Sequence, residues 1–598
     1  MKVGVQIGPT AGCAFYDQGR VLFAASEERY SNIKNDTVFP YAAIQDGMRY
    51  LGITPKEIEK VILVSQRMSP IHYLVKREAS FSIADYMREQ NEYYKPTLLG
   101  GNKLNYLEIF SDRLILNGTS NELYKKISEA SADAKLSDIW NDWRIEEAAR
   151  VFGIARKSIL IMKHETSHAA YGYYGSPFRG DDVLVVTCDG FGDEANATIS
   201  ELQVSKSHTL ASYENFNIGR IYRYITLLLA MKPGEHEFKV MGLAPYASEH
   251  EYRRALEVFS KSYQFTEGEI TSDPQLRDHF FYFRERLEGC RFDGIAGALQ
   301  IFTERMMCDL VKYWMERAEK KRVVLSGGVS LNIKANMEVG KLDVVKDLFV
   351  VGSGGDESLC IGAIFAHEED CGNGAKIQCL SNLYLGGAPT KAEIDEVINR
   401  ASALTGGSIV VRRNVSSQDI AQLLASGKIL GRVVGRMEFG ARSLGNRSIL
   451  ADPRFNATIK KINKQIKNRD FWMPFTPSIL DVDESTYLDN RKKFTFPYMS
   501  VACSSTNKAQ QDIPAALHPA DGTARPQVVS VQENAAYYDL ISEFKKLTGV
   551  GALLNTSLNL HGYPMVRTPE QAYYVFEHSE LDGLILEDNL ILRNADYV

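Results

Sequence analysis

Val183-Leu184-Val185-Val186-Thr187-Cys188, followed by Asp189-Gly190-Phe191-Gly192-Asp193, has the pattern of a buried strand that ends in a glycine turn. Residues 322–325 and 348–351 are similar apolar runs, and each of them also leads into glycines and then a helical pattern. Short β-branched runs alternate with helical patterns along the chain, which predicts an α/β fold. Turns of this kind face ligands at the carboxyl ends of strands, where backbone amides point towards negative charge.

The length of 598 residues exceeds what one hydrophobic core usually supports, so we expect at least two domains. Residues 368–387 are rich in Glu, Gly and Asn, and we place the boundary there. The predicted organisation is a first domain over residues 1–370, a linker over 371–407 and a second domain over 408–598. Residues 73–116, rich in Tyr, Asn and Glu, are predicted to form an inserted helical lid.

Composition excludes several classes of protein. No run of about 18 apolar residues is present and the N-terminal residues lack the profile of a secretory signal, so we expect a cytoplasmic protein without a membrane span. The net charge is −6 and no Lys/Arg block interleaved with aromatic residues occurs, which argues against nucleic acid as a partner. The eight cysteines show no C-x-x-C spacing, so neither a disulfide framework nor a zinc ribbon is indicated.

Four arginines, Arg432, Arg436, Arg442 and Arg447, fall within the glycine-rich residues 431–448. Glycines let backbone amides approach a phosphate, and guanidinium groups bind its oxygens in bidentate fashion. The stretch therefore predicts an oxyanion site, and the alternative is a solvated basic strand and turn that makes surface ion pairs.

His164-Glu165-Thr166-Ser167-His168 follows an apolar run, residues 158–162. If a helix begins at His164, the two imidazoles are at i and i+4 and share one face. Asp189 and Asp356 follow two of the predicted strands, so all four side chains can meet in one cleft as a mixed N/O metal site suited to Fe(II), Mn(II) or Zn(II). The alternatives are a purely structural histidine pair, and Asp193 as no more than a helix cap.

Taken in order, these and other motifs resemble the O-carbamoyltransferases of antibiotic, nodulation-factor and toxin biosynthesis over nearly the whole chain. The motifs are Ser26-Glu27-Glu28-Arg29-Tyr30, His164-x-x-x-His168, Asp189-Gly190-Phe191-Gly192-Asp193, Lys239-Val240-Met241-Gly242, Ser326-Gly327-Gly328-Val329-Ser330-Leu331-Asn332, Gly355-Asp356, the arginine stretch, Asp521-Gly522-Thr523-Ala524-Arg525-Pro526-Gln527 and Asn555-Thr556-Ser557. The resemblance implies an N-terminal actin-like (ASKHA, TsaD-like) domain followed by a C-terminal YrdC-like α/β domain.

The resemblance also implies a two-site enzyme. In the YrdC-like domain, carbamoyl phosphate and Mg-ATP would yield carbamoyladenylate, which then moves internally to the TsaD-like domain. There a divalent metal, Fe(II) by analogy, would be held by His164, His168, Asp189 and Asp356 while a hydroxyl of a small-molecule acceptor takes the carbamoyl group.

The residues that would bind the substrates follow from the same motifs. Carbamoyl phosphate and ATP are assigned to Arg436, Arg442, Arg447, Lys467, Arg469, Arg525, Gln527, Asn555, Thr556 and Ser557. The adenylate in the first domain is assigned to Lys239, Gly242, Gly327, Gly328 and Asn332, and the acceptor to Thr10 and Glu28. Simpler alternatives are that Lys239 pairs with Glu235, that Glu28 and Arg29 form a surface ion pair, and that Asn332 caps a helix.

Relatives carry a histidine after the first strand where this chain has Gly8-Pro9-Thr10-Ala11. Thr10 cannot replace an imidazole as a base, so Asp189 and the metal are the expected helpers. Two other functions stay open: a tRNA threonylcarbamoyl transferase and a non-catalytic nucleotide-binding regulator. The acidic balance is compatible with a cationic acceptor such as a guanidinium alkaloid toxin or an aminoglycoside, a macrolide or sugar is the alternative, and a homodimer is the default state.

Overall fold

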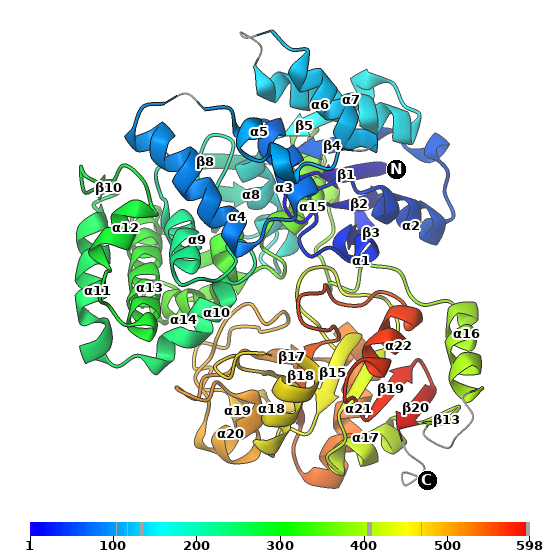
Figure 1. Cartoon of the computed structure of the whole chain (residues 1–598). Coiled ribbons are helices and arrows are strands. Elements are labelled where there is room, and N and C mark those ends of the chain that lie inside the picture. The colour runs from blue at the N-terminus through cyan, green and yellow to red at the C-terminus, as the bar shows by residue number, and fades with distance from the viewer. Residues whose placement is uncertain are drawn as a thin grey trace. The chain divides into compact units, whose positions relative to one another are not determined.

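The computed structural model describes residues 1–102, 104–116, 118–131, 135–204, 206–403, 409–467 and 469–593 (Figure 1). The chain divides into two compact units. The N-terminal unit comprises Met1–Leu22 and Asn35–Cys379, and the C-terminal unit comprises Phe23–Lys34 and Leu380–Val598. Residues 404–408, which hold the end of the predicted linker and the predicted start of the second domain, lie outside the described residues.

Two five-stranded sheets of the same topology lie in the N-terminal unit, except that the last residues of one edge strand, residues 23–26, are assigned to the C-terminal unit. In the first, strands are ordered β3-β2-β1-β4-β5, with β1 antiparallel to β2 and parallel to β4, and β4 parallel to β5. The second has the order β12-β11-β6-β7-β8, again with an antiparallel meander (β6, β7, β8) extended by parallel strands (β11, β12). A small β9-β10 hairpin completes the strands.

The bounds of β6, β11 and β12 agree with the predicted runs to within one residue, because most residues of each run are apolar and buried. The strands of these sheets are β1 Lys2–Gln6, β2 Gly12–Asp17, β3 Arg20–Ser26, β4 Lys60–Val64, β5 Ile159–Met162, β6 Val183–Cys188, β7 Ala197–Gln203, β8 Lys206–Tyr213, β9 Tyr263–Thr266, β10 Glu269–Ser272, β11 Arg322–Ser326 and β12 Asp347–Val350.

Two buried helices connect the sheets at the centre of this unit. Helix α8 (His164–Gly175) follows β5 but packs on β6 and β11 of the other sheet, whereas α15 (Leu359–Asp370) packs on β1 and β4. The two helices pack against each other, and glycines allow the close approach: a Cβ on Gly362 would overlap the carbonyl oxygen of Ser167. This crossing places the first turn of α8 beside the carboxyl ends of β6 and β12.

The remaining helices of the N-terminal unit lie outside the sheets (Figure 1). They are α2 Tyr41–Leu51, α3 Pro70–Ala79, α4 Ile83–Arg88, the π-helix η2 Glu89–Leu99, α5 Tyr106–Ile109, α6 Gly118–Ser128, α7 Leu136–Phe152, α9 Ile218–Leu228, α10 Glu237–Leu243, α11 Glu249–Ser262, α12 Phe281–Arg286, α13 Phe292–Arg317 and α14 Ile333–Lys341.

The segment predicted as a helical lid is mostly helical where it is described, with short non-helical connections, but its helices begin at Pro70 and bury a hydrophobic core. Val75, Phe81 and Phe110 pack with Leu227 of α9 and Phe281 of α12. The segment is therefore part of the packed unit, because its aromatic residues supply hydrophobic contacts that weak helical periodicity does not reveal.

The C-terminal unit is built on one eight-stranded mixed sheet of order β13-β20-β19-β14-β15-β18-β16-β17. Its strands are β13 Ile409–Arg412, β14 Leu430–Val433, β15 Arg447–Ala451, β16 Thr476–Leu480, β17 Gln527–Val529, β18 Ala552–Ser557, β19 Gly583–Leu586 and β20 Asn589–Arg593. Its helices are α1 Glu28–Ser31, α16 Lys391–Ser402, α17 Ser417–Ala425, α18 Ala457–Lys461, α19 Glu484–Tyr487, α20 Asn507–Asp512, α21 Val531–Thr548 and α22 Pro569–Glu577. One hydrophobic core, with Ile398, Ile449 and Tyr573 among its members, joins α16 and α22 to the sheet.

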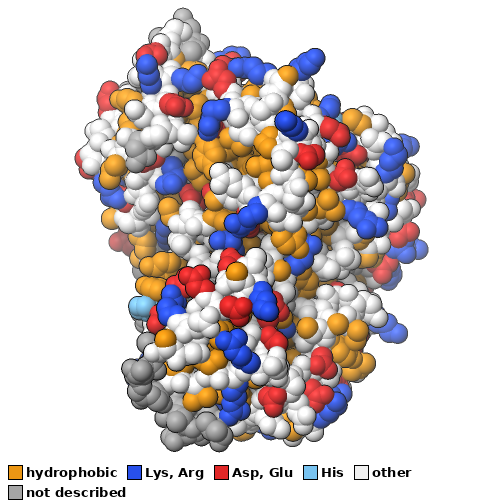
Figure 2. All heavy atoms as spheres, turned by 90° about the vertical axis from the view of Figure 1, so that its right-hand side faces the viewer, with side chains coloured by type: hydrophobic (Ala, Val, Ile, Leu, Met, Phe, Trp, Pro, Cys, Tyr) orange, Lys and Arg blue, Asp and Glu red, His pale blue; other side chains and the backbone are white. Residues whose placement is uncertain are grey.

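On the face shown in Figure 2, basic and acidic side chains are interspersed and no wide area carries a single charge. No helix of the described residues combines the length and apolar character needed to cross a membrane.

Candidate functional site

The N-terminal unit brings together His164, His168, Asp189 and Asp356, whose ligand atoms all lie within 4.8 Å of one another. The Nε2 atoms of the two histidines are 3.2 Å apart. His168 Nε2 lies 3.3 Å from Asp189 Oδ2, and His164 Nε2 lies 3.6 Å from Asp356 Oδ1. His168 is buried, whereas the side chain of Asp356 is 24% exposed, so the cluster has one open side. The i, i+4 spacing on α8 produces this arrangement as the sequence indicates.

The first turn of α8 is held by a carboxylate from the loop after β6. Asp193 Oδ2 accepts the backbone amide of His164 at 2.8 Å, while its Oδ1 accepts the amides of Gln66 and Arg67, each at 2.8 Å. A carboxylate stabilises the amides of a helix N-terminus, so Asp193 acts as a cap of α8.

Ser65 orients one of the two rings. Its Oγ lies 2.9 Å from His164 Nδ1, which leaves Nε2 to face the cluster. Ser65 has a left-handed backbone with φ 64°, and buried Arg144 donates hydrogen bonds to the carbonyl oxygens of Val64 and Ser65. No motif marks Ser65 in the sequence, since it meets His164 only through the pairing of β4 with β5.

The turns after β6 and β11 fix Asp189. Its Oδ2 accepts the Gly328 amide at 2.6 Å and its Oδ1 accepts the Gly190 amide at 2.5 Å. A Cβ on Gly327, where φ is 89°, would overlap the Cys188 carbonyl oxygen, so glycine is required for this approach. Burial alone would raise the pKa of Asp189, but the hydrogen bond with His168 and the neighbouring imidazoles hold it below its usual range.

The donor set fits a divalent cation. Two imidazole Nε2 atoms and two carboxylates form a mixed N/O set suited to Fe(II), Mn(II) or Zn(II). Burial would lower the pKa of His168, but Asp189 and Asp356 outweigh it and raise that pKa to about 9, so the carboxylates favour positive charge at this point.

The residues expected to bind the adenylate lie in three places. Gly327 and Gly328 belong to the turn that holds Asp189, and Lys239 and Gly242 lie on α10. Asn332 instead caps α14, because its Oδ1 accepts the Ala335 amide at 3.0 Å and its amide pairs with Gln300. The capping alternative for Asn332 is therefore the one that the structure shows.

Thr10 and Glu28, the two residues expected to bind the acceptor, fall in different units. Thr10 has φ 61° and donates its hydroxyl to the Pro9 carbonyl oxygen at 2.5 Å. Glu28 lies 3.7 Å from Arg29, which is 2% exposed and donates to the Met565 and Gly440 carbonyl oxygens. The two residues therefore do not form a surface ion pair, since Arg29 is buried and its hydrogen bonds stabilise the C-terminal unit.

In the C-terminal unit, four of the predicted phosphate-binding side chains form a cation cluster, namely Arg442, Lys467, Arg469 and Arg525. Burial lowers the pKa of Arg469 to about 10, with a further contribution from Arg442. Burial also lowers the pKa of Arg525 well below its usual range, again helped by Arg442 and Arg469. Lys467 is buried and held by the carbonyl oxygens of Ser557 and Asn559. Cations that repel one another in this way favour an anionic ligand among them.

The other predicted residues Arg436, Arg447, Gln527 and Asn555 make hydrogen bonds to protein atoms in and around the arginine loop. Arg447 is fully buried and donates to the backbone carbonyls of Val434, Gly435, Asn446 and Arg567, while Arg436 donates to those of Leu385 and Gly386. The side-chain amide of Asn555 donates hydrogen bonds to the Ser443 carbonyl oxygen and the Ser478 hydroxyl. Gln527 donates to the Leu444 carbonyl oxygen and accepts a hydrogen bond from the Ser478 hydroxyl. These bonds hold the arginine loop in place, although Arg447 Nη2 is buried and has no hydrogen-bond partner among the described residues.

Glu438 organises the same loop. Its Oε1 accepts the backbone amides of Leu444, Asn446 and Arg447 at 2.8, 2.7 and 3.1 Å. Thr556 and Ser557 are half-buried at the end of β18, where the Ser557 hydroxyl donates to Asn559 Oδ1 at 2.7 Å.

Comparison with known proteins decides the family. Residues 2–365 match the family profile described as Carbamoyltransferase N-terminus, and residues 421–593 match the one described as Carbamoyltransferase C-terminus. The chain belongs to the carbamoyltransferase family.

Several relatives of this carbamoyltransferase match it over most of its length. An uncharacterized protein of Methanocaldococcus jannaschii is 26% identical over 96% of this chain and 96% of its own. Nodulation protein NolNO of Sinorhizobium fredii is 28% identical over 96% of this chain and 78% of its own, and nodulation protein NolO of Bradyrhizobium diazoefficiens is 30% identical over 72% and 79%.

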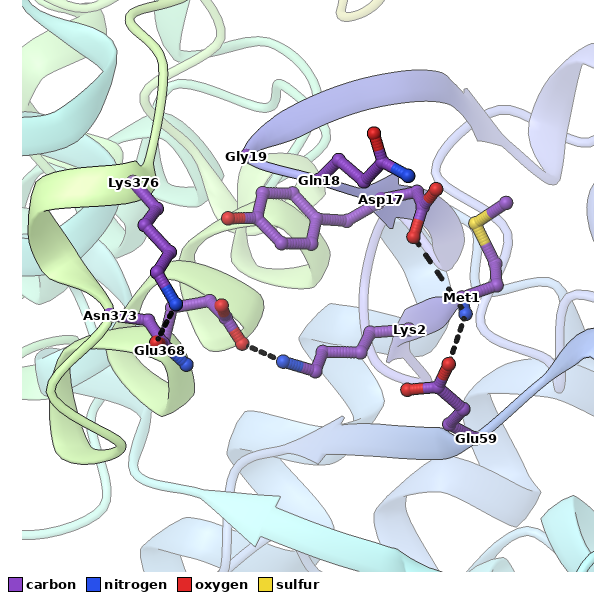
Figure 3. A pocket seen from close by; sticks show the side chains of 10 residues that line it. Met1, Lys2, Asp17, Gln18, Gly19, Glu59, Glu368, Asn373 and Lys376 are labelled. Atoms are coloured by element: carbon purple, nitrogen blue, oxygen red, sulfur yellow. Dashed lines mark hydrogen bonds and ion pairs between the residues drawn. The ribbon is translucent and has the colours of Figure 1, made fainter.

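The carbamoyltransferase also has a cavity of about 450 Å³ where β1 begins and β2 ends, and none of the predicted site residues lines it. Its charged groups neutralise one another: Lys2 pairs with Glu368, and the Met1 amine lies 3.2 Å from Glu59 and 3.9 Å from Asp17 (Figure 3). The cavity therefore presents no unbalanced charge to a ligand.

Proposed function

We propose that this chain is an O-carbamoyltransferase that uses carbamoyl phosphate and ATP to make carbamoyladenylate and transfers the carbamoyl group to a hydroxyl of a small molecule. The observation that carries the proposal is the pair of unlike sites in a member of the carbamoyltransferase family. One unit holds two histidines and two carboxylates within 4.8 Å, and the other holds a cluster of mutually repelling cations.

The C-terminal unit would form the mixed anhydride. Water cleaves carbamoyl phosphate to carbamate and phosphate; a carbamate oxygen then attacks the α-phosphorus of ATP, and the bond from that phosphorus to the bridging oxygen of pyrophosphate breaks. Arg442, Lys467, Arg469 and Arg525 would neutralise the negative charge of these groups, and the partly exposed guanidinium groups can donate bidentate hydrogen bonds. By the resemblance of its motifs, we assign this unit to the YrdC-like type.

The N-terminal unit would carry out the transfer. The acceptor oxygen forms a bond to the carbamoyl carbon, the bond from that carbon to the phosphate oxygen breaks, and AMP leaves. His164, His168, Asp189 and Asp356 would hold a divalent ion, Fe(II) by the family resemblance, which supplies Lewis-acid polarisation when bound. The repeated topology of the two sheets, with α8 and α15 crossing between them, supports the actin-like, TsaD-like assignment.

The hydroxyl proton needs an acceptor, and we do not assign this role to Asp189 or Thr10. Asp189 is kept ionised by His168 and accepts two glycine amides, which makes it a weak base. The Thr10 hydroxyl already donates to Pro9. We therefore assign the proton to the phosphate of the departing AMP.

Incubation of the protein with ATP and carbamoyl phosphate tests the proposal. We expect pyrophosphate to form only when both substrates are present, and added alcohols to release AMP and to show the gain of one carbamoyl group by mass spectrometry. Absence of pyrophosphate would favour a nucleotide-binding regulator, and competition by tRNA for pyrophosphate release would favour a tRNA-modifying enzyme.

A further inference from the structure

An exposed aromatic ring and an arginine lie at the turn that follows Asp189 of the His–Asp cluster. Phe191 is the second residue after Asp189, and its side chain is 46% exposed. The guanidinium carbon of Arg220 lies 4.4 Å from the centroid of the Phe191 ring. Because one face of the ring carries the guanidinium group, the pair offers a cation and an apolar surface at the same place.

Backbone packing fixes this pair to the metal-site turn. Arg220 Nε donates to the Gly190 carbonyl oxygen at 2.7 Å. The residue before it, Gly219, comes so close that a Cβ would lie 2.9 Å from the Gly190 nitrogen and 3.1 Å from the carbonyl carbon of Asp189. The first turn of α9 thus rests on the turn that holds Asp189, so Arg220 is positioned by the backbone.

The charge of Arg220 is not balanced by a carboxylate. Within the described part of the chain Arg220 makes no ion pair. The titratable side chains that interact with it electrostatically are Tyr94, Tyr224 and Tyr263, and none of them is a carboxylate. Its Nη2 has one long contact, 3.5 Å, to Asn196 Oδ1. Arg223, on the next turn of α9 and 5.9 Å from the same ring, differs because Glu89 and Glu237 face it. Arg220 is therefore a half-buried cation with donor capacity left for an oxyanion.

We propose that Arg220 and Phe191 form the acceptor subsite, in which Arg220 binds an oxyanion carried by the acceptor and Phe191 packs against its ring or alkyl part. The inference rests on the proposed function, since it supplies the alcohol for transfer at the neighbouring cluster. It also replaces the cationic acceptor that the net charge of −6 favours, because a binding partner responds to the local field of Arg220 more strongly than to distant charges.

Matched probes test the subsite on the full-length protein. 4-(Hydroxymethyl)benzoate and 4-(hydroxymethyl)benzamide share a ring and an alcohol but differ in charge, and calorimetric titration gives the affinity of each. We expect the benzoate to bind at least about tenfold more tightly than the benzamide, and Arg220→Gln to abolish that preference. Arg220→Lys should restore part of it, and Phe191→Leu should weaken both probes.

A control variant and a nucleotide probe complete the design. Arg286→Gln removes another stacked arginine, 3.7 Å from the Tyr282 ring centroid, and should keep the wild-type preference. Equal affinity of the wild type for the two probes would overturn the proposal. It would also be overturned if Arg220→Gln weakened binding of AMP and left the preference intact, since Arg220 would then serve the nucleotide phosphate. Formation of pyrophosphate from ATP and carbamoyl phosphate, measured separately, distinguishes failure of the subsite from failure of the proposed function.

Discussion

Among single residues, Ser65 decides which nitrogen of the His164 ring faces the cluster. Its hydroxyl lies 2.9 Å from His164 Nδ1, and its left-handed backbone is held by Arg144. Loss of such a contact typically weakens metal binding by roughly 10- to 100-fold. We expect Ser65→Ala to lower the affinity for Zn(II) or Co(II) by at least about tenfold. Titration of the metal-free protein with Zn(II) or Co(II) in the presence of a competing chelator measures this affinity.

The control for this prediction is Ser167→Ala. Ser167 lies one residue before His168 and is buried, but its hydroxyl donates to the Lys163 carbonyl oxygen at 2.8 Å and not to an imidazole. Equal loss of affinity in both variants would show that Ser65 acts on packing and does not orient the ring.

The residue scale also shows what the sequence could predict. The positions of His164, His168, Asp189 and Asp356 follow from helical spacing and from strand ends, which are local patterns. Arg447 and Asn555 could not be assigned in this way, because whether a polar side chain faces a ligand or a backbone carbonyl depends on the sheet that surrounds it. Ser65 carries no local signal at all, since 99 residues separate it from His164.

At the scale of elements, the crossing of α8 and α15 determines the geometry of the cluster. Gly362 of α15 lies against the Ser167 carbonyl oxygen, between the two histidines of α8. A methyl group there must push the helices apart, so we expect Gly362→Ala to lower the free energy of unfolding by roughly 1–3 kcal/mol. Denaturant unfolding followed by circular dichroism measures this loss.

Gly172→Ala is a matched control on α8. Its Cβ would lie 3.3 Å from side-chain atoms of Ser326 and Val185, which can shift, and alanine favours a helix by about 1 kcal/mol. We expect a change in unfolding free energy smaller than that of Gly362→Ala. A larger loss in Gly172→Ala would mean that the α8–α15 contact is not the tight one.

The α3 helix carries a pH-dependent contribution to stability. Burial lowers the pKa of His72 to about 3, with Lys76 and Arg223 adding to the effect. Because the unfolded chain binds the proton below about pH 6.5 and the folded chain does not, stability is complete above that pH and falls as the pH drops towards 3. We expect the wild type to lose about 1.4 kcal/mol more per pH unit than His72→Leu in this window. Urea unfolding between pH 4 and pH 7 measures how the free energy of unfolding changes with pH in each protein. Identical pH dependence of the two proteins would refute the prediction.

At the scale of the whole molecule, the chain is divided differently from the sequence-based boundaries. Phe23–Lys34 belongs to the C-terminal unit although it precedes most of the N-terminal unit. Composition marks a boundary only where the chain becomes polar, as it does near residue 380. A short segment that joins a distant unit through buried contacts, such as those of Arg29, leaves no such mark.

The division into two units leads to a final prediction about the two half-reactions. His168 belongs to the His–Asp cluster of one unit and Arg442 to the cation cluster of the other. We expect His168→Ala to lower transfer to the alcohol by at least about 100-fold while pyrophosphate and carbamoyladenylate still form from ATP and carbamoyl phosphate. Arg442→Ala should abolish pyrophosphate formation from ATP but still transfer the carbamoyl group from supplied carbamoyladenylate, with release of AMP. Because a defect in folding would remove both activities at once, the opposite patterns are the discriminating result. Loss of both half-reactions in either variant, with an unchanged melting temperature, would mean that one site performs both steps.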